Sequence, residues 1–451
     1  MNKLLYYLKI FLRLTTDKIN NQKIKNNLFQ AIPFWVGAVL TALMAIFYTQ
    51  LFNLAEHLLA SLMNWHRWAI FVVAPSGFVI SWWLVKRFAP YARGSGIPQV
   101  MAAVEISTPK TYRKIGKLLS LRVMIVKILS SMVLVLGGGA VGREGPTIQI
   151  SGSIFKAINE WLPASWPKVS KKNMIMTGAA AGLSAAFNTP LGGIVFAIEE
   201  LTRTHFSYFK TALFSGVIIA GFLTQSISGS YLYIGSPEVS GVSLWVVFPV
   251  ILIALICGLS SSLLAHFLLK ILKYKERFSK TRQHITFLII SGLIVAALAF
   301  FVNELILGSG KNIMEMTLFG EDKTLDWYVP IFRMLGTGIS FASGGSGGIF
   351  APSLAAGASV GAVIAGWLQV SVAEANIMIL AGMVAFLVGM TRAPFTSAIL
   401  VLEMTNHHGL IFHLMLAGLV ASLVAMLVSR HSFYDVLKVR YLKELFREER
   451  P

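Results

Sequence analysis

A carboxylate and a guanidinium are neighbours in the glycine-rich stretch GGGAVGREGPTIQISG, which covers residues 137–152. They belong to Glu144 and Arg143, and the surrounding sequence is apolar enough for the interior of a lipid bilayer. An ionisable side chain at that depth costs about 2.5–3.5 kcal/mol on insertion scales, so a function is its default interpretation. A structural ion pair between Glu144 and Arg143 is the alternative, but adjacent residues of a turn point apart.

Glu144 lies in one of three glycine-rich turns that each lead into an apolar helical segment. The turns are GSGIP at 94–98, GREGP at 142–146 and GGSGGIFAP at 344–352. Proline fits the first turn of a helix, and glycine lets the backbone approach a ligand closely. A helix that begins inside the membrane exposes unpaired N–H groups and its positive dipole end, which a bound anion would satisfy. Close helix packing is the alternative use of these glycines, but three such turns predict an anion site without a metal or other cofactor.

The elements that must hold these turns are membrane helices. Hydrophobic residues make up 55% and charged residues 13% of the 451 residues, and the mean hydropathy is +0.69. These values exclude a soluble protein of this size and predict an all-α polytopic membrane protein. Apolar runs long enough to span lipid occur at 34–63, 68–88, 118–136, 207–228, 243–269, 285–302, 374–390 and 410–429.

The net charge of +19 results from 39 Lys and Arg against 20 Asp and Glu. The basic residues gather in short stretches beside the apolar runs, which is the positive-inside pattern of loops near anionic lipid headgroups. This distribution favours membrane lipids over nucleic acid as partners. We expect a multi-pass protein of the cell inner membrane with both termini in the cytosol. The single cysteine, Cys257, excludes disulfides and thiolate metal sites, and the histidines have no metal-ligand spacing.

Two segments of the first half recur in the second half at nearly one spacing. GREGPT at 142–147 pairs with GIFAPS at 348–353, and 348 − 142 gives an offset of 206. Residues 178–200 pair with 382–404, and 382 − 178 gives 204. The chain therefore contains an internal duplication. Basic residues precede the first apolar run but follow its counterpart, so the two repeats are expected to have opposite orientations, as in many transporters.

We expect one membrane unit and no soluble domain. Its predicted parts are a basic cytosolic N-terminal helix or tail at 1–32, a first membrane repeat at 33–228, an extracellular or periplasmic linker at 229–242, a second membrane repeat at 243–430, and a C-terminal helix with a basic cytosolic tail at 431–451. The first 30 residues are polar and basic, so no cleaved signal peptide is expected.

In this order, the segments GSGIP, GREGP and GGIFAP resemble the signatures of the CLC family of chloride channels and chloride/proton antiporters. The tyrosine of SFYDVL near the chain end matches as well, and the similarity extends from about residue 33 to residue 440. Residues 99–141 form a longer segment than is usual in bacterial members. The resemblance implies an inverted repeat of broken, tilted helices without cytosolic regulatory domains. It also implies a homodimer with one pathway in each subunit.

The resemblance assigns a role to particular residues. The Ser95 hydroxyl, the Tyr434 phenol and the backbone N–H groups of Ile349 and Phe350 would bind a dehydrated chloride ion. Glu144 would be the gate and the external proton acceptor. Because its carboxylate has the same charge as chloride, it would occupy an anion position until protonation releases it, so anion and proton occupancy would exclude each other. The supporting residues would be Gly94, Gly96, Lys127, Arg143, Gly145 and Gly348.

Glu200 is the residue that distinguishes the antiporter interpretation from that of a passive channel. Glu199 and Glu403 are repeat mates and are expected to be structural caps or interhelical partners, whereas Met404 takes the place equivalent to Glu200. By resemblance, Glu200 at the end of a helix over 190–200 is the internal proton-transfer glutamate, which channel members generally lack. A solvated carboxylate at the membrane interface is the alternative. We therefore expect exchange of chloride for protons, with a passive chloride channel as the nearest alternative.

Two further features allow other interpretations. Lys127, within LRVMIVKILSSMV, is expected to act electrostatically in the interior, with an acidic partner or snorkelling as alternatives. An intramembrane serine protease is a remote alternative, because GGSG at 344–347 mimics a nucleophile motif and His413 follows. The glycines around Ser346 argue against an ordered nucleophile, so the chain is not expected to be an enzyme. It has no GxxxxGK[ST] motif, and no nucleotide is expected.

The residue at position 95 is expected to control anion selectivity. Relatives that favour nitrate tend to have proline there, and fluoride-exporting relatives depart at GREGP and at the tyrosine. The Ser95→Pro variant should therefore shift the preference from chloride towards nitrate by about tenfold, the value of one lost hydrogen bond to an anion. The ratio of the two anion fluxes through reconstituted protein measures this change, and an unaltered ratio would count against Ser95 as a ligand.

Overall fold

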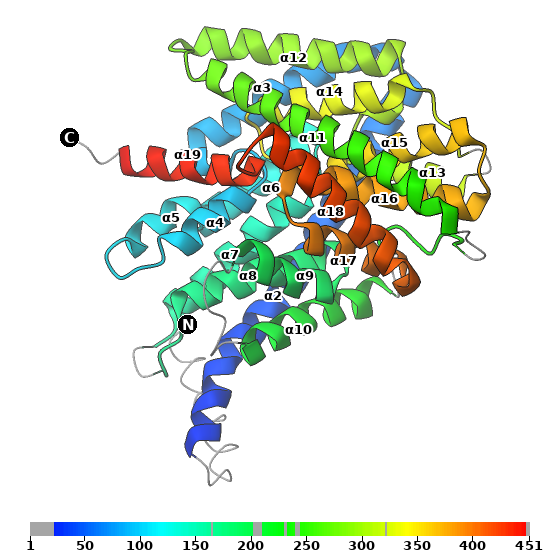
Figure 1. The fold of residues 1–451 in the computed structure, drawn as a ribbon. Helices are drawn as coiled ribbons and strands as arrows, with labels where there is room; N and C mark the ends of the chain where they lie inside the picture. Colours follow the sequence, from blue (N-terminus) through cyan, green and yellow to red (C-terminus); the bar gives the residue numbers. More distant parts are fainter. Residues whose placement is uncertain are drawn as a thin grey trace.

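The computed structural model describes residues 22–163, 166–201, 210–229, 232–239, 244–320 and 323–447. Apart from two isolated β-bridges, these residues form helices and the turns and loops between them (Figure 1). Nine spans within the described residues are long and apolar enough to cross a membrane, by length and composition. The all-α polytopic architecture predicted from composition is therefore confirmed.

Apart from the short α5 in the first half, the helices follow a similar order of long and short elements in both halves. The first half contains α2 (Gln22–Trp65), α3 (Ile70–Phe88), α4 (Ile97–Glu105), α5 (Ile115–Leu118), α6 (Leu121–Leu136), α7 (Glu144–Trp161), α8 (Lys171–Phe187), α9 (Pro190–Phe196) with a π-helical turn (Ala197–Leu201), and α10 (Lys210–Ser228). The second half contains α11 (Val247–Lys275), α12 (Thr281–Phe301), α13 (Lys311–Phe319), α14 (Tyr328–Ala342), α15 (Phe350–Leu368), α16 (Val372–Thr391), α17 (Pro394–Thr405) and α18 (Ile411–Val428), followed by α19 (Phe433–Arg447).

Each of the eight predicted apolar runs overlaps one of these spans, although the runs 207–228 and 243–269 begin in residues outside the described ones. One span, Phe350–Leu368, was not predicted. Its mean hydropathy of 1.4 is the lowest of the nine described spans, because glycine, alanine and serine replace larger apolar residues. Those small side chains let α15 pack closely against other helices, and nearly all of its residues are buried. A hydropathy window finds lipid-facing helices more readily than a buried helix of this kind.

The predicted parts of the chain extend beyond what the structure describes. Several pieces of the predicted parts lie outside the described residues, namely 1–21, 164–165, 202–209, 230–231, 240–243, 321–322 and 448–451. Helix α2 begins at Gln22 and continues without a break past Pro33. The boundary that we expected between the N-terminal tail and the first repeat, at residue 32, therefore falls inside a single helix.

The internal duplication is visible in the way matching helices end and begin. Asn188 is the C-cap of helix α8 and Arg392 is the C-cap of helix α16, and 392 − 188 gives the predicted offset of 204. Both residues have left-handed backbone conformations, with φ of 56° and 65°. Pro190 and Pro394 then begin the next helices at the same offset. In each repeat the two preceding helices pack together, α7 on α8 and α15 on α16.

Two glutamates connect the repeats through helix ends. Glu199 accepts hydrogen bonds from two backbone N–H groups in the first turn of α17, at 3.1 and 2.7 Å. Glu403 accepts two from the first turn of α9, at 3.0 and 2.8 Å. Each carboxylate satisfies donors that a helix leaves unpaired at its start. The expectation that this pair of repeat mates is structural is confirmed.

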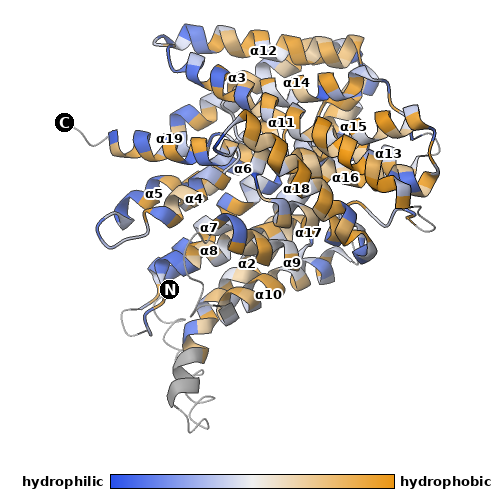
Figure 2. Cartoon of the chain, viewed as in Figure 1, coloured by the Kyte–Doolittle hydropathy of each residue, from blue (hydrophilic) through white to orange (hydrophobic). Residues whose placement is uncertain are grey.

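Apolar side chains also cover the outer faces of the long helices. Helix α18 exposes Phe412, Leu423 and Leu427, with 83%, 65% and 89% of their surfaces accessible. Figure 2 shows α12 and α18 as mainly hydrophobic, whereas hydrophilic residues gather on α5 and α19. Outward apolar faces of this length fit a lipid environment, since monomeric soluble proteins rarely expose large contiguous apolar patches.

Candidate functional site

The three glycine-rich turns meet in the interior of the bundle. The turn before α4 pairs with the turn before α15, where the Gly94 N–H donates to the Gly345 carbonyl at 2.8 Å and the Gly347 N–H donates to the Gly94 carbonyl at 3.1 Å. The turn before α7 joins them through Gly142 and Gly348, which exchange two hydrogen bonds of 2.8 and 2.7 Å. The starts of α4, α7 and α15 are therefore fixed relative to one another.

Glycine is required in these turns for conformation and for space. Gly94 and Gly96 have φ of 63° and 106°, in the left-handed region that other residues avoid. A Cβ atom at Gly145 would lie 2.2 Å from the Ser95 Oγ. One at Gly348 would lie 3.0 Å from backbone atoms of the facing turn. These glycines allow two backbones and the Ser95 hydroxyl to converge.

The Ser95 hydroxyl and the Tyr434 phenol are buried and have no protein partner other than each other. Each residue is 1% exposed, and neither oxygen makes a hydrogen bond of ordinary geometry among the described residues, although the two side chains lie close enough to interact. The ring of Phe350 stacks on that of Tyr434, with ring centres 6.2 Å apart and planes at 12°. A buried donor without an acceptor costs about 1–3 kcal/mol, so two of them at one place favour a ligand that accepts hydrogen bonds.

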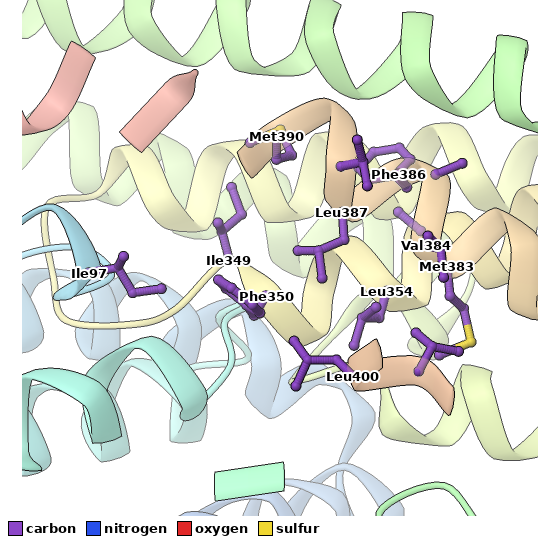
Figure 3. Close-up of a cluster of buried hydrophobic side chains, with 14 of the residues drawn as sticks. Ile97, Ile349, Phe350, Leu354, Met383, Val384, Phe386, Leu387, Met390 and Leu400 are labelled. Atoms are coloured by element: carbon purple, nitrogen blue, oxygen red, sulfur yellow. The ribbon is translucent and has the colours of Figure 1, made fainter. Parts of the chain in front are cut away.

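Ile349 and Phe350 form the start of α15. They are the cap and first residue of this helix, and they are 0% and 2% exposed. The close-up in Figure 3 shows both side chains among apolar neighbours, with Ile97 from the start of α4 on one side and Leu387 of α16 on another. The first N–H groups of a helix have no acceptor within it. In apolar surroundings, their partial positive charge favours an anion.

Glu144 is the first residue of α7 and is fully buried. The Tyr233 hydroxyl donates to its Oε1 at 2.9 Å. The carboxylate also lies close to the backbone amide of Ala351, the second residue of α15. It packs against Gly142, where a Cβ atom would be 2.3 Å from Oε2. A tethered carboxylate thus occupies the position in front of α15 that suits an anion.

Arg143 has partners on two other segments. Its Nη1 donates to Oδ1 of Asn53 on α2 at 2.8 Å, and its guanidinium carbon lies 5.7 Å from the centre of the Tyr233 ring. Its positive charge also acts on the neighbouring Glu144. Arg143 therefore contributes to the electrostatics of the site while α2 and the tyrosine hold it in place.

Tyr233 is the main part of this site that the sequence did not predict. It lies in the segment 229–242, which we expected to be only a linker, yet it is 2% exposed. Its ring packs edge-on against Phe187 at the end of α8, with ring centres 5.0 Å apart. The aromatic and aliphatic residues of YLYIG at 231–235 were the available signal, since a purely solvated linker has no need of them.

Glu200 lies in the π-helical turn that follows α9, rather than at the end of a regular helix over 190–200. It is 9% exposed, so the alternative of a solvated interfacial carboxylate is wrong. Its charge is close enough to act on Tyr434. Single π-helical turns are rare and frequently occur at functional sites. The spacing of apolar residues in the sequence did not reveal that this turn is π-helical rather than α-helical.

Lys127 is completely buried, and its ammonium donates to the carbonyls of Ala92 and Gly94 at 2.8 and 2.7 Å. It therefore neither snorkels nor depends on an acidic partner. Gly94 belongs to the turn that contains Ser95, and Ala92 lies just before it. Lys127 therefore fixes the backbone at the start of this turn.

Ser346, the nucleophile of the protease alternative, has a structural role. Its hydroxyl donates to the Ala92 carbonyl at 2.6 Å, and its N–H donates to the Ser130 hydroxyl at 3.0 Å. No hydrogen bond joins Ser346 to His413 in the described part of the chain. The contacts of Ser346 thus match those of the other residues that connect the turns.

Comparison with known proteins places the chain in a family. The family model described as voltage gated chloride channel matches residues 77–426. The H(+)/Cl(-) exchange transporter ClcA of Citrobacter koseri is 32% identical over 390 residues, which cover 84% of this chain and 80% of that protein. The protein of the same name from Klebsiella pneumoniae is 30% identical over 397 residues, with coverage of 84% and 82%. The chain therefore belongs to the voltage-gated chloride channel (CLC) family, as its signature segments predicted.

Solved structures support the same assignment. A slow cyanobacterial Cl-/H+ antiporter has a TM-score of 0.79 at 27% identity, over 94% of this chain and 99% of the other. A CLC-type fluoride/proton antiporter shares the fold with a TM-score of 0.75 at 19% identity, over 92% and 98% of the two chains. The predicted inverted repeat of broken helices in a multi-pass membrane protein is confirmed.

The contact between Gly145 and Ser95 yields a direct test of the site. The Gly145→Ala variant should bind chloride about tenfold more weakly or worse, because the new methyl group would displace the Ser95 hydroxyl and remove one hydrogen bond to the anion. Titration calorimetry of the purified protein with chloride measures the change. Gly152→Ala is the matched control on α7, since a Cβ there meets its nearest neighbour at 3.5 Å. If both variants bind chloride like the wild type, Ser95 does not bind the anion.

Proposed function

We propose that this protein is an antiporter that exchanges chloride for protons across the cell inner membrane. One observation carries the proposal most directly: the buried Glu144 carboxylate lies before the start of α15, in the space that an anion would occupy. The two ClcA relatives are named as H(+)/Cl(-) exchange transporters, and the cyanobacterial structure is described as a Cl-/H+ antiporter. These names support the same activity for this chain.

In this proposal, chloride binds without its water shell between two hydroxyl donors and two backbone amides. The Ser95 and Tyr434 hydroxyls are buried and make no hydrogen bond of ordinary geometry among the described residues, which suits donation to an anion. The amides of Ile349 and Phe350 at the start of α15 add their partial positive charge. Full charges on the ligands are not needed, so the ion is held by dipoles and can leave again. No cofactor is required.

Glu144 acts as the gate and as the external proton carrier. Its deprotonated carboxylate competes with chloride for the amides of α15, because both carry one negative charge. Protonation removes that attraction, and the neutral side chain can leave the pathway. The Tyr233 hydroxyl donates to the carboxylate at 2.9 Å, so it stabilises the charged form in the closed position. Alternation between the two anions couples proton movement to chloride movement.

Glu200 carries the proton between the cytosol and the interior. It is buried, and its charge is close enough to act on Tyr434. A passive chloride channel would use the same anion site, but it would have no use for a second buried carboxylate. An ionisable group at this depth is expensive to keep. The burial of Glu200 therefore favours the antiporter over the channel.

The proposed assembly is a homodimer with one pathway in each subunit and both termini in the cytosol. Its partners are chloride, protons and the surrounding lipids. The basic stretches between the spans would face the anionic lipids of the cytosolic leaflet. Neither nucleic acid nor a nucleotide takes part in this mechanism.

The gate assignment predicts the behaviour of Glu144→Gln. This variant mimics the neutral form, so chloride should still cross while coupled proton movement falls about 100-fold, the usual contribution of a positioned proton carrier. Chloride and pH electrodes read together on reconstituted liposomes measure both fluxes, and the wild type must show both if it is an antiporter. Glu160→Gln on the same helix is the control, since that carboxylate is 44% exposed. Persistent coupling in Glu144→Gln would disprove the gate.

The internal proton pathway predicts a different separation of fluxes. Glu200→Gln should stop proton movement while chloride still crosses, because the amide cannot accept and release a proton. The neighbouring Glu199→Gln is the control: its amide oxygen can still accept from the first turn of α17, so coupling should survive. The same two-electrode assay applies. An unchanged exchange ratio in Glu200→Gln would remove this residue from the proton pathway, whereas chloride flux without coupled proton movement in the wild type would favour the channel.

A further inference from the structure

The two hydroxyl donors of the proposed anion site belong to elements that are far apart in the sequence. Ser95 lies in the turn before α4, and Tyr434 is the second residue of α19. Chloride can bind both only if the turn and the helix keep a set separation. The question is which contacts determine that separation.

Arg93 connects the two elements directly. It lies two residues before Ser95, and its guanidinium forms an ion pair with Glu444 of α19. The guanidinium carbon also lies 5.0 Å from the centre of the Tyr441 ring, a cation–π contact with the same helix. One side chain of the turn is therefore held by two residues of α19.

The backbone of Arg93 strengthens this connection. The Tyr441 hydroxyl donates to the Arg93 carbonyl at 3.5 Å, and the Gln99 amide of α4 donates to the same carbonyl at 2.7 Å. Tyr441 and Glu444 follow Tyr434 by 7 and 10 residues, which is about two and three helical turns. Because a short helix moves as a rigid unit, a shift of Arg93 relative to these residues would also shift Tyr434.

Two other residues of α19 form ion pairs with neighbouring elements. Lys438 pairs with Glu105 at the far end of α4, at 2.8 Å, and Arg440 pairs with Glu276 just after α11. Within α19, Lys438 also pairs with Asp435, and Arg440 also pairs with Glu444. A cavity of about 350 Å³ borders Arg93, Gly94, Tyr441 and Glu444. Apolar packing therefore does not fill all the space between the Ser95 turn and this part of α19. Among the ion pairs that join α19 to other elements, the one at Arg93 is nearest in sequence to a proposed anion ligand.

We propose that Arg93 is a positioning residue for the anion site. Through Glu444 and Tyr441, it sets the separation between the Ser95 hydroxyl and the Tyr434 phenol. This inference depends on the proposed function, because it assumes that both hydroxyls bind the anion. The two charged side chains are each 34% exposed, so added salt screens their attraction. Chloride affinity should therefore depend on this ion pair even though neither member touches the anion.

The test compares three changes of the ion pair in the purified full-length protein. Arg93→Gln and Glu444→Gln should each weaken chloride binding about fivefold, the range of a partly exposed ion pair, measured by titration calorimetry. The exchange ratio of chloride to protons should remain that of the wild type. The double variant Arg93→Gln with Glu444→Gln should bind chloride no more weakly than the weaker single variant, because both changes break the same interaction.

Glu276→Gln is the matched control, since it breaks the ion pair between α19 and the end of α11 and leaves both α4 and the Ser95 turn untouched. It should bind chloride like the wild type. If Glu276→Gln loses as much affinity as Arg93→Gln, or if the losses of the two single variants add in the double variant, α19 needs its charges only for folding and the proposal is wrong. Unchanged affinity in both single variants would also overturn it. Failure of the anion site itself differs from these outcomes, because Ser95→Ala would then bind chloride like the wild type.

Discussion

Helix starts inside a membrane must find acceptors for backbone N–H groups that no water can satisfy. In the described residues, this chain meets that constraint repeatedly with its own carboxylates. Glu199 and Glu403 accept from the first turns of α17 and α9, and Glu56 accepts from the Ser309 N–H before α13 at 2.8 Å. Glu144 lies before α15 in the same way. The difference is that α15 also borders two hydroxyls that make no hydrogen bond of ordinary geometry among the described residues. A structural cap and the proposed gate thus use one physical interaction.

The duplication shows how much of this arrangement both repeats share. The turn GSG occurs at 94–96 before α4 and at 308–310 before α13, and 308 − 94 gives an offset of 214. Both glycines of each turn have positive φ, 63° and 106° in the first and 62° and 86° in the second. Each turn is held by a buried basic side chain. Lys127 donates to the Gly94 carbonyl of the first turn, and Arg333, which is 206 positions later, donates to the Gly308 carbonyl at 3.0 Å.

The repeats differ in what faces these turns. In the second repeat, Glu56 accepts from the Ser309 N–H, and the Ser309 hydroxyl accepts from the Lys311 N–H at 3.5 Å. In the first repeat, the Ser95 hydroxyl makes no hydrogen bond of ordinary geometry among the described residues. The same backbone geometry therefore leads to a filled cap in one repeat and to an open donor in the other. Because the Glu56 carboxylate already occupies the second turn, only the first contributes to the proposed anion site.

The division between what could and could not be predicted from the sequence follows from the range of the forces involved. Gly and Pro act on their own backbone, so the helix starts near Ser95 and Glu144 were predictable from short motifs. Span Phe350–Leu368 was missed because its small residues suit burial among helices rather than lipid. Tyr233 and the π-helical turn around Glu200 were missed because both depend on packing between distant segments. Local chemistry determines where a helix breaks, whereas tertiary packing determines which partner the exposed end finds.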